Sequence, residues 1–118
     1  MKKLYHLSTC NTCQRIIREL HLPQEVVLQD IKSEPISKEQ LEEVQELAGS
    51  YEALFSKRAR LYKALDLKNK SLKEDDYKTH ILEHYTFLKR PVLIYDGSIF
   101  IGNSKKVVEA AKVAIHAK

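Results

Sequence analysis

Alternating apolar and polar residues open the chain and then give way to a helical spacing. Residues 2–7, "KKLYHL", alternate between two faces and predict a strand. The turn-forming residues "STCN" follow, and residues 12–20 then predict a helix that ends before Pro23. The apolar face of this helix comprises Cys13, Ile16, Ile17 and Leu20. Residues 25–31, "EVVLQDI", predict a second strand, so the chain begins with a β-α-β unit.

The pattern is helical over the middle of the chain, about residues 36–85. Ser37 and Gln40 have the spacing of a capping box at a helix start. Ser71 and Glu74 repeat that spacing and predict the start of another helix. The predicted helical segments cover residues 41–48, 51–57, 59–65 and 72–85.

Strand patterns return near the end. Apolar runs at residues 91–95 and 98–102 are separated by "DG", which indicates a tight hairpin. Residues 103–117 predict a last amphipathic helix. Its predicted apolar stripe comprises Val107, Ala110, Ala111 and Ala114. The order of elements predicts an α/β fold in one domain, residues 1–118. A four-stranded mixed sheet carries helices on both faces, and the helical insertion, about residues 36–85, lies between strands 2 and 3.

Composition narrows the class of protein. The 118 residues are 43% hydrophobic and 31% charged, which is typical of one globular domain. No apolar window reaches the roughly 18 residues of a membrane span, and the N-terminal apolar run is too short for a signal peptide. We therefore expect a cytoplasmic protein. The net charge of +4 is mildly basic, so we expect no direct binding to nucleic acid.

The only two cysteines, Cys10 and Cys13, form a C-x-x-C motif at a strand-to-helix turn. In a cytoplasmic chain this motif indicates redox chemistry, since two cysteines make neither a disulfide framework nor a zinc site. The helix N-terminus favours a thiolate at Cys10, which we predict to be the nucleophile. Cys13 lies one turn further on and is predicted to be the resolving thiol. The alternative is that both cysteines are small core residues.

A thiolate that attacks an oxyanion or a disulfide needs positive charge nearby to hold an anionic substrate. The candidates are Arg15 beside the motif, Arg58 in the helical block and Arg90 before the third strand. Pro91 stands where a strand begins, a place that tolerates the missing N–H group, and we expect it to shape the substrate edge.

The sequence resembles the arsenate reductase-like (ArsC/Spx) family of the thioredoxin fold over nearly its whole length. The segments that carry the resemblance are "LYHLSTCNTCQR", "IKSEPISKEQLEEV", "LFSKRARLYKAL" and "LKRPVLIYDGSIFIG". The resemblance implies a thioredoxin-like sheet with a helical insertion, a cis peptide bond at Pro91 and a role for Arg90 in binding oxyanions. In arsenate reductases of this type the first cysteine, here Cys10, attacks arsenate. Glutathione and glutaredoxin then complete the reduction.

The chain departs from the glutaredoxin-coupled arsenate reductases at several positions, among them Cys13, Gln14 and Ser56. The first hypothesis is therefore a thiol oxidoreductase that acts on an oxyanion such as arsenate or on a disulfide, with glutathione or a glutaredoxin-type protein as reductant. It binds no metal, flavin or nucleotide. The second hypothesis is an Spx-like redox-sensing regulator of transcription that binds the RNA polymerase α subunit. In that case the C-x-x-C motif is a switch and does not turn over.

Overall fold

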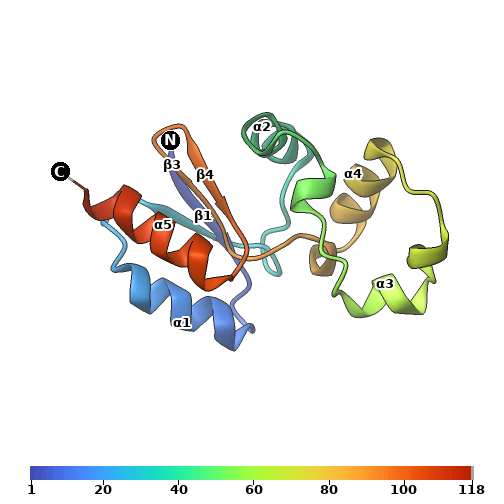
Figure 1. Cartoon of the computed structure of the whole chain (residues 1–118), viewed down its shortest axis with the longest axis horizontal. Helices are drawn as coiled ribbons and strands as arrows, with labels where there is room; N and C mark the ends of the chain where they lie inside the picture. Colours follow the sequence, from blue (N-terminus) through green and yellow to red (C-terminus); the bar gives the residue numbers. More distant parts are fainter. Residues whose placement is uncertain (118) are drawn as a thin grey trace. The chain divides into compact units, whose positions relative to one another are not determined.

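The chain is divided into two compact units in the computed structural model, which describes residues 1–117. The sheet unit joins Met1–Glu34 to the segment that begins at Arg90, and the helical unit is Pro35–Lys89. Figure 1 shows that the strands belong to the sheet unit and that helices fill the other. The sequence placed the helical insertion at about residues 36–85, so its expected limits lie close to the limits of the helical unit.

The sheet unit is built on four strands, which confirms the predicted mixed sheet. The strands are β1 (Lys2–His6), β2 (Val27–Asp30), β3 (Val92–Tyr95) and β4 (Ser98–Ile101). Their order is β2-β1-β3-β4. β1 is parallel to β2 and antiparallel to β3, and β3 is antiparallel to β4. The predicted "DG" hairpin joins β3 to β4, with positive φ at both Asp96 (48°) and Gly97 (85°), as a type I′ turn requires.

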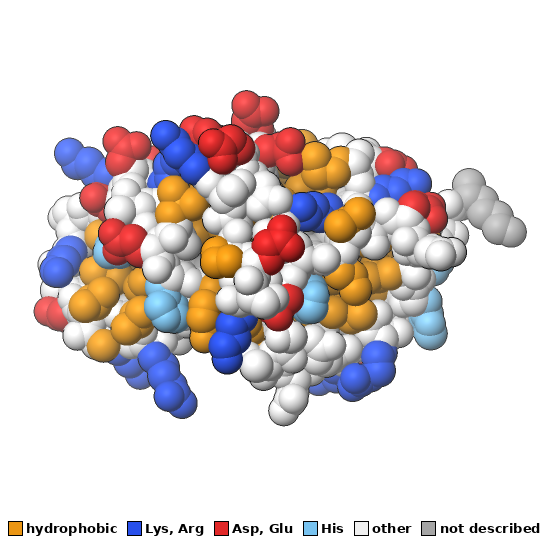
Figure 2. Space-filling model, turned by 180° about the vertical axis from the view of Figure 1, so that it is seen from behind, with side chains coloured by type: hydrophobic (Ala, Val, Ile, Leu, Met, Phe, Trp, Pro, Cys, Tyr) orange, Lys and Arg blue, Asp and Glu red, His pale blue; other side chains and the backbone are white. Residues whose placement is uncertain are grey.

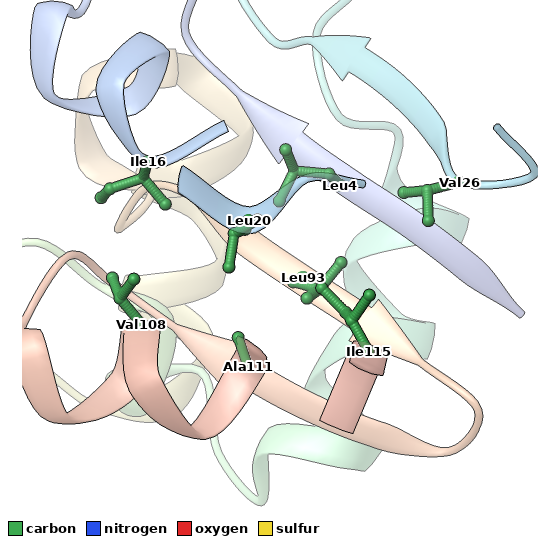
Figure 3. Packing of buried hydrophobic residues seen from close by; sticks show 8 residues of the cluster. All are labelled: Leu4, Ile16, Leu20, Val26, Leu93, Val108, Ala111 and Ile115. Carbon is green, nitrogen blue, oxygen red and sulfur yellow. The ribbon is translucent and has the colours of Figure 1, made fainter. Parts of the chain in front are cut away.

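Two helices of the sheet unit, α1 (Asn11–Leu20) and α5 (Lys105–His116), cover the same face of the sheet (Figure 1). Leu4 of β1 and Leu93 of β3 are register partners, so both side chains leave the sheet on that face. Figure 3 shows them against side chains from α1, α5 and the segment before β2. The cluster comprises Leu4, Ile16, Leu20, Val26, Leu93, Val108, Ala111 and Ile115. The sequence predicted helices on both faces, but within the sheet unit the two helices share one face.

Two expectations for the sheet unit need correction. The stripe of α5 that packs inward is Val108, Ala111 and Ile115, so only Ala111 belonged to the predicted stripe. Ala110 is exposed, because an alanine-rich helix gives little contrast between its faces and the sheet decides which side is buried. The second strand is also shorter than residues 25–31, since a turn closed by the Val26 N–H and the Pro23 carbonyl oxygen (3.1 Å) occupies its expected start.

The helical unit contains α2 (Lys38–Ala48), α3 (Arg60–Ala64), α4 (Glu74–Glu83) and three 3₁₀ turns, η1 (Glu52–Leu54), η2 (Leu67–Asn69) and η3 (Tyr85–Phe87). The predicted capping box begins α2. The Gln40 N–H donates to Ser37 Oγ at 3.1 Å, and the Ser37 N–H donates to Gln40 Oε1 at 3.0 Å. Phe55 is the centre of an aromatic cluster in this unit, with ring centroids 4.8 Å from Tyr77 and 5.2 Å from Phe87.

The predicted capping box at Ser71 and Glu74 is wrong. α4 begins at Glu74 itself, and the Lys73 N–H donates to the Asp76 carboxylate at 2.8 Å. The Glu74 carboxylate instead accepts the N–H groups of Tyr51 and Glu52, at 2.6 and 3.1 Å. It therefore caps the start of η1, a contact between distant segments that local spacing does not reveal.

The surface carries charged side chains of both signs, with hydrophobic side chains visible among them on one face (Figure 2). The exposed hydrophobic residues include Val27 and Leu28 on β2 and Val113 on α5. Across residues 1–117, no helix combines the length and the apolar composition that crossing a membrane requires.

Candidate active site

The turn between β1 and α1 presents Cys10 at the start of the helix. The Cys10 N–H donates to the Leu7 carbonyl oxygen at 3.0 Å and closes the turn. The Cys10 carbonyl oxygen accepts the Gln14 N–H at 3.1 Å, which is the first hydrogen bond of α1. Cys10 is thus the N-cap residue, with an extended backbone (φ −95°, ψ 112°). Its side chain lies where the first N–H groups of a helix lack intrahelical partners.

The pKa of the Cys10 thiol is lowered from its ordinary value. Partial burial is the largest single influence and acts in the opposite direction, because it disfavours a charged sulfur. The N–H groups of Cys13 and Thr12, the thiol of Cys13 and the positive charge of Arg90 together outweigh it. Cys10 is also partly exposed to solvent.

Cys13 has the opposite character. Its side chain is fully buried, and burial raises the pKa of its thiol to about 11. Its hydrogen bond to the Cys10 sulfur and the negative charge on that sulfur also raise the pKa, whereas the Leu7 N–H and Arg90 lower it. Both cysteines are free thiols in the structure. Cys10 is therefore the more acidic of the two thiols, and Cys13 keeps its proton at neutral pH.

Arg90 and Pro91 lead into β3 and reach the cysteines through strand pairing. β3 runs antiparallel to β1 with Val92 opposite Tyr5, which brings the start of β3 beside the end of β1. The Arg90–Pro91 bond is cis, as the family resemblance implied. Because the charge of Arg90 lowers the pKa of both cysteines, the structure brings together three of the predicted site residues, with Pro91 directly following.

Arg15 and Arg58, the other two predicted arginines, belong to other elements of the chain. Arg15 is exposed on α1, two residues after Cys13 and thus about 200° around the helix from it. Arg58 is exposed in the turn before α3, within the helical unit. The cation that the structure associates with the cysteines is Arg90.

Sequence reasoning missed two residues that hold the turn before Cys10. The Asp30 carboxylate, at the end of β2, accepts the Ser8 N–H at 3.1 Å. The side-chain amide of Gln14 donates to the carbonyl oxygens of Leu7 and Ser8, at 3.5 and 3.4 Å. The predicted β-α-β unit contained the signal for Asp30, because parallel strands end at the same edge of a sheet.

The described residues offer no metal-binding cluster: within 1–117, no group of three His, Cys, Asp or Glu side chains could hold an ion. His80 and His84 lie four residues apart at the end of α4. The His80 ring packs against Phe87 at 5.3 Å between centroids, and His84 Nδ1 accepts the Thr86 N–H at 3.1 Å.

The fold and the site define a thioredoxin-like α/β protein with a C-x-x-C dithiol at the start of its first helix. The sequence matches the ArsC family over residues 5–111. The chain belongs to this family, as its motifs predicted. Comparison with curated proteins found no significant match.

Solved structures share the fold. A protein named YFFB (PA3664) is similar with a TM-score of 0.78 and 20% identity, covering 98% of this chain and 99% of its own. An arsenate reductase from Vibrio cholerae has a TM-score of 0.76 and 19% identity, covering 96% of each chain. An arsenate reductase (ArsC) related protein from Brucella melitensis has a TM-score of 0.70 and 20% identity, covering 92% of each.

Proposed function

We propose that the protein is a thiol-dependent oxidoreductase in which Cys10 is the nucleophile and Cys13 the resolving thiol. One observation carries the proposal: a partly exposed Cys10 with a lowered pKa lies at the N-cap of α1, one helical turn before a buried Cys13 whose pKa is raised to about 11. Thiol–disulfide exchange requires such a pair, in which one thiol is ready to attack the substrate and the other stays protonated until the mixed disulfide has formed.

With a disulfide as substrate, the Cys10 thiolate attacks one sulfur and forms a mixed disulfide. The substrate's own S–S bond breaks, and its other half leaves as a thiolate that takes a proton from solvent. Cys13 then loses its proton and attacks the Cys10 sulfur, which releases the second half as a thiol. The substrate has gained two electrons, and the protein holds a Cys10–Cys13 disulfide. Two molecules of glutathione return it to the dithiol and leave as glutathione disulfide.

The order of the two steps follows from what raises the pKa of Cys13. Part of that rise comes from the negative charge on the neighbouring Cys10 sulfur. Once Cys10 is bonded to a substrate, this charge is gone and Cys13 loses its proton more readily. Formation of the adduct thus activates the thiol that resolves it.

Arsenate is the second substrate class that the site accommodates. The Cys10 thiolate attacks arsenic(V) and forms a sulfur–arsenic bond, while one arsenate oxygen takes up protons from solvent and leaves as water. A second thiol, from Cys13 or glutathione, then attacks the Cys10 sulfur. The bonding electrons remain on arsenic, which leaves as arsenite, and a disulfide is formed. Arg90 is the cation we assign to the arsenate oxygens in this reaction, and a glutaredoxin-type protein is the candidate reductant.

A redox-sensing role is the second candidate, and the same pair of thiols supports it. An internal Cys10–Cys13 disulfide removes the charge at the start of α1 and ties its first turn to the preceding loop. An Spx-like regulator would use that change to alter its binding to the RNA polymerase α subunit. Both candidates place the protein in the cytoplasm, where thiols are kept reduced.

The experiment compares the protein with Cys10→Ser and Cys13→Ser variants. Each is incubated with a glutathione mixed disulfide and glutathione, and separately with arsenate, glutathione and glutaredoxin. We expect turnover in at least one assay, its loss in Cys10→Ser, and accumulation of a mixed disulfide on Cys10 in Cys13→Ser, detected by mass spectrometry. No turnover and no adduct, with capture of the RNA polymerase α subunit by the oxidised protein, would favour the regulator.

A further inference from the structure

We propose that Asp30 is a positioning residue of this site: its carboxylate fixes the turn that presents Cys10 to the substrate. The inference rests on the proposed function, since it concerns the reactivity of the same sulfur. Asp30 acts through the backbone of Ser8, and nothing requires it to touch the substrate.

The Asp30 carboxylate is held by several donors at the end of β2. Its Oδ1 accepts the N–H of Ser8 at 3.1 Å and the N–H of Lys32 at 3.2 Å. Its Oδ2 accepts the hydroxyl of Ser33 at 3.2 Å. The Ser8 side chain has the largest influence, and together with the bonds from the Ser8 and Lys32 N–H groups and the Ser33 hydroxyl it outweighs desolvation and lowers the pKa of Asp30 to about 2. The carboxylate is therefore ionised at neutral pH, and its hydrogen bonds hold it in one position.

Ser8 lies inside the turn that ends at Cys10. The turn is closed by the hydrogen bond from the Cys10 N–H to the Leu7 carbonyl oxygen, so the position of Ser8 is coupled to that of Cys10. Asp30 holds Ser8 from β2 through its N–H, while Gln14 holds it from α1 through its carbonyl oxygen. Both polar groups of the Ser8 backbone are thus hydrogen-bonded, the N–H to Asp30 and the carbonyl oxygen to Gln14, two residues before Cys10.

A substitution at Asp30 should shift the pKa of Cys10 in one direction if Asp30 acts only through its charge, and in the opposite direction if it positions the turn. A carboxylate near a thiolate disfavours it, so loss of the charge alone lowers the pKa of Cys10. Loss of the anchor frees the turn and changes the position of the sulfur relative to the N–H groups of Thr12 and Cys13, which lower its pKa, so the pKa rises. The direction of the shift therefore identifies the role.

The test measures the rate at which iodoacetamide alkylates Cys10 in the full chain as a function of pH. Peptide mapping distinguishes alkylation at Cys10 from alkylation at Cys13. For Asp30→Ala we expect the pH profile to move upward and the rate at pH 7 to fall about threefold to tenfold, since a shift of one pH unit is tenfold in thiolate. For Asp30→Asn, which keeps an acceptor oxygen for the Ser8 N–H, we expect a profile equal to the original or moved downward. Ser33→Ala is the matched control, because it removes a partner of Asp30 outside the turn and should leave the profile in place.

An unchanged or lowered profile in Asp30→Ala would overturn the inference, as would an upward shift of the same size in Asp30→Asn. If Asp30→Ala does not fold, judged by circular dichroism, the contrast between Asp30→Asn and Ser8→Pro decides. The proline lacks the N–H that Asp30 binds, so it should shift the profile upward while Asp30→Asn does not, and an unshifted Ser8→Pro profile overturns the inference. An ordinary pKa for Cys10 in the unsubstituted protein is a different result, because it contradicts the proposed function itself.

Discussion

Cys13 follows Cys10 by one turn of α1, so a buried thiol with a raised pKa comes directly after a partly exposed thiol whose pKa is lowered. Free cysteines in a protein core are usually inert, and Cys13 alone would be one of them. Its position one turn after the helix N-cap changes that role, because the thiol of Cys13 is one of the groups that lower the pKa of Cys10.

Selective alkylation follows from this pair. Near pH 7 we expect iodoacetamide to modify Cys10 about 100-fold faster than Cys13 or more, because the two thiols differ in pKa and only Cys10 is exposed. Peptide mapping by mass spectrometry after short reaction times measures the ratio. In denaturant both cysteines should react alike, and equal labelling of the folded protein would contradict the assignment.

Arg90 provides a second test. Substitution by glutamine removes a charge that lowers the pKa of Cys10, so the alkylation profile should move to higher pH and the rate at pH 7 should fall about two- to fivefold. Arg15→Gln is the matched control, since Arg15 is exposed on α1 and lies about 200° around the helix from Cys13. A profile that moves equally in both variants would indicate a general effect of net charge.

The stability of the protein should depend on Asp30 at low pH. Its pKa is about 2 in the folded chain, below the value of about 3.9 expected when unfolded. A lowered carboxyl pKa contributes stability above the unfolded value, and that contribution is lost as the pH falls from about 4 toward 2. Urea unfolding across this window should show a shallower loss of stability in Asp30→Asn. Equal slopes in both proteins would show that Asp30 has no shifted pKa.

The cluster beneath the sheet predicts a large cost for a cavity. Leu93 is 2% exposed and packs against Leu4 and α5, so Leu93→Ala should lower the free energy of unfolding by about 2–5 kcal/mol. Val113→Ala on α5 is the control, since Val113 is 67% exposed and should cost under about 0.5 kcal/mol. Denaturant unfolding measures both, and a similar cost for the two would place Leu93 outside the core.

The two candidate helix caps give a contrast between serines. Ser37→Ala removes an observed capping-box acceptor and should cost about 1 kcal/mol of unfolding free energy. Ser71→Ala should cost little, because Ser71 lies outside the α4 cap formed by Lys73 and Asp76. A larger loss in Ser71→Ala than in Ser37→Ala would contradict these cap assignments.

These serines also show how far the sequence alone reaches. The capping box of α2, the strand at β1 and the "DG" hairpin follow from local chemistry, and all three were predicted. The start of α4 was missed because Glu74 binds N–H groups more than twenty residues away. The buried stripe of α5 was missed because small apolar residues occur on several faces of this helix, so the sequence does not show which face packs on the sheet.

At the site, too, the features set by local sequence were predicted and those set by contacts between distant residues were not. The place of Cys10 at a helix start is local and was predicted from the turn and the apolar spacing. The proximity of Arg90 depends on the pairing of β1 with β3, and only the family resemblance suggested it. Asp30 was missed although its strand was predicted, because the sequence does not show that its carboxylate accepts a hydrogen bond from the Ser8 N–H.

The pairing of β1 with β3 also has a consequence for synthesis on the ribosome. Leu4 pairs with Leu93, 93 − 4 = 89 positions further along, so the helical unit is made before the sheet can be completed. Such long-range contacts form slowly. Both sulfurs are therefore synthesised well before Arg90 and the covering α5. We conclude that the contribution of Arg90 to the acidity of the Cys10 thiol is gained only after β3 has been made.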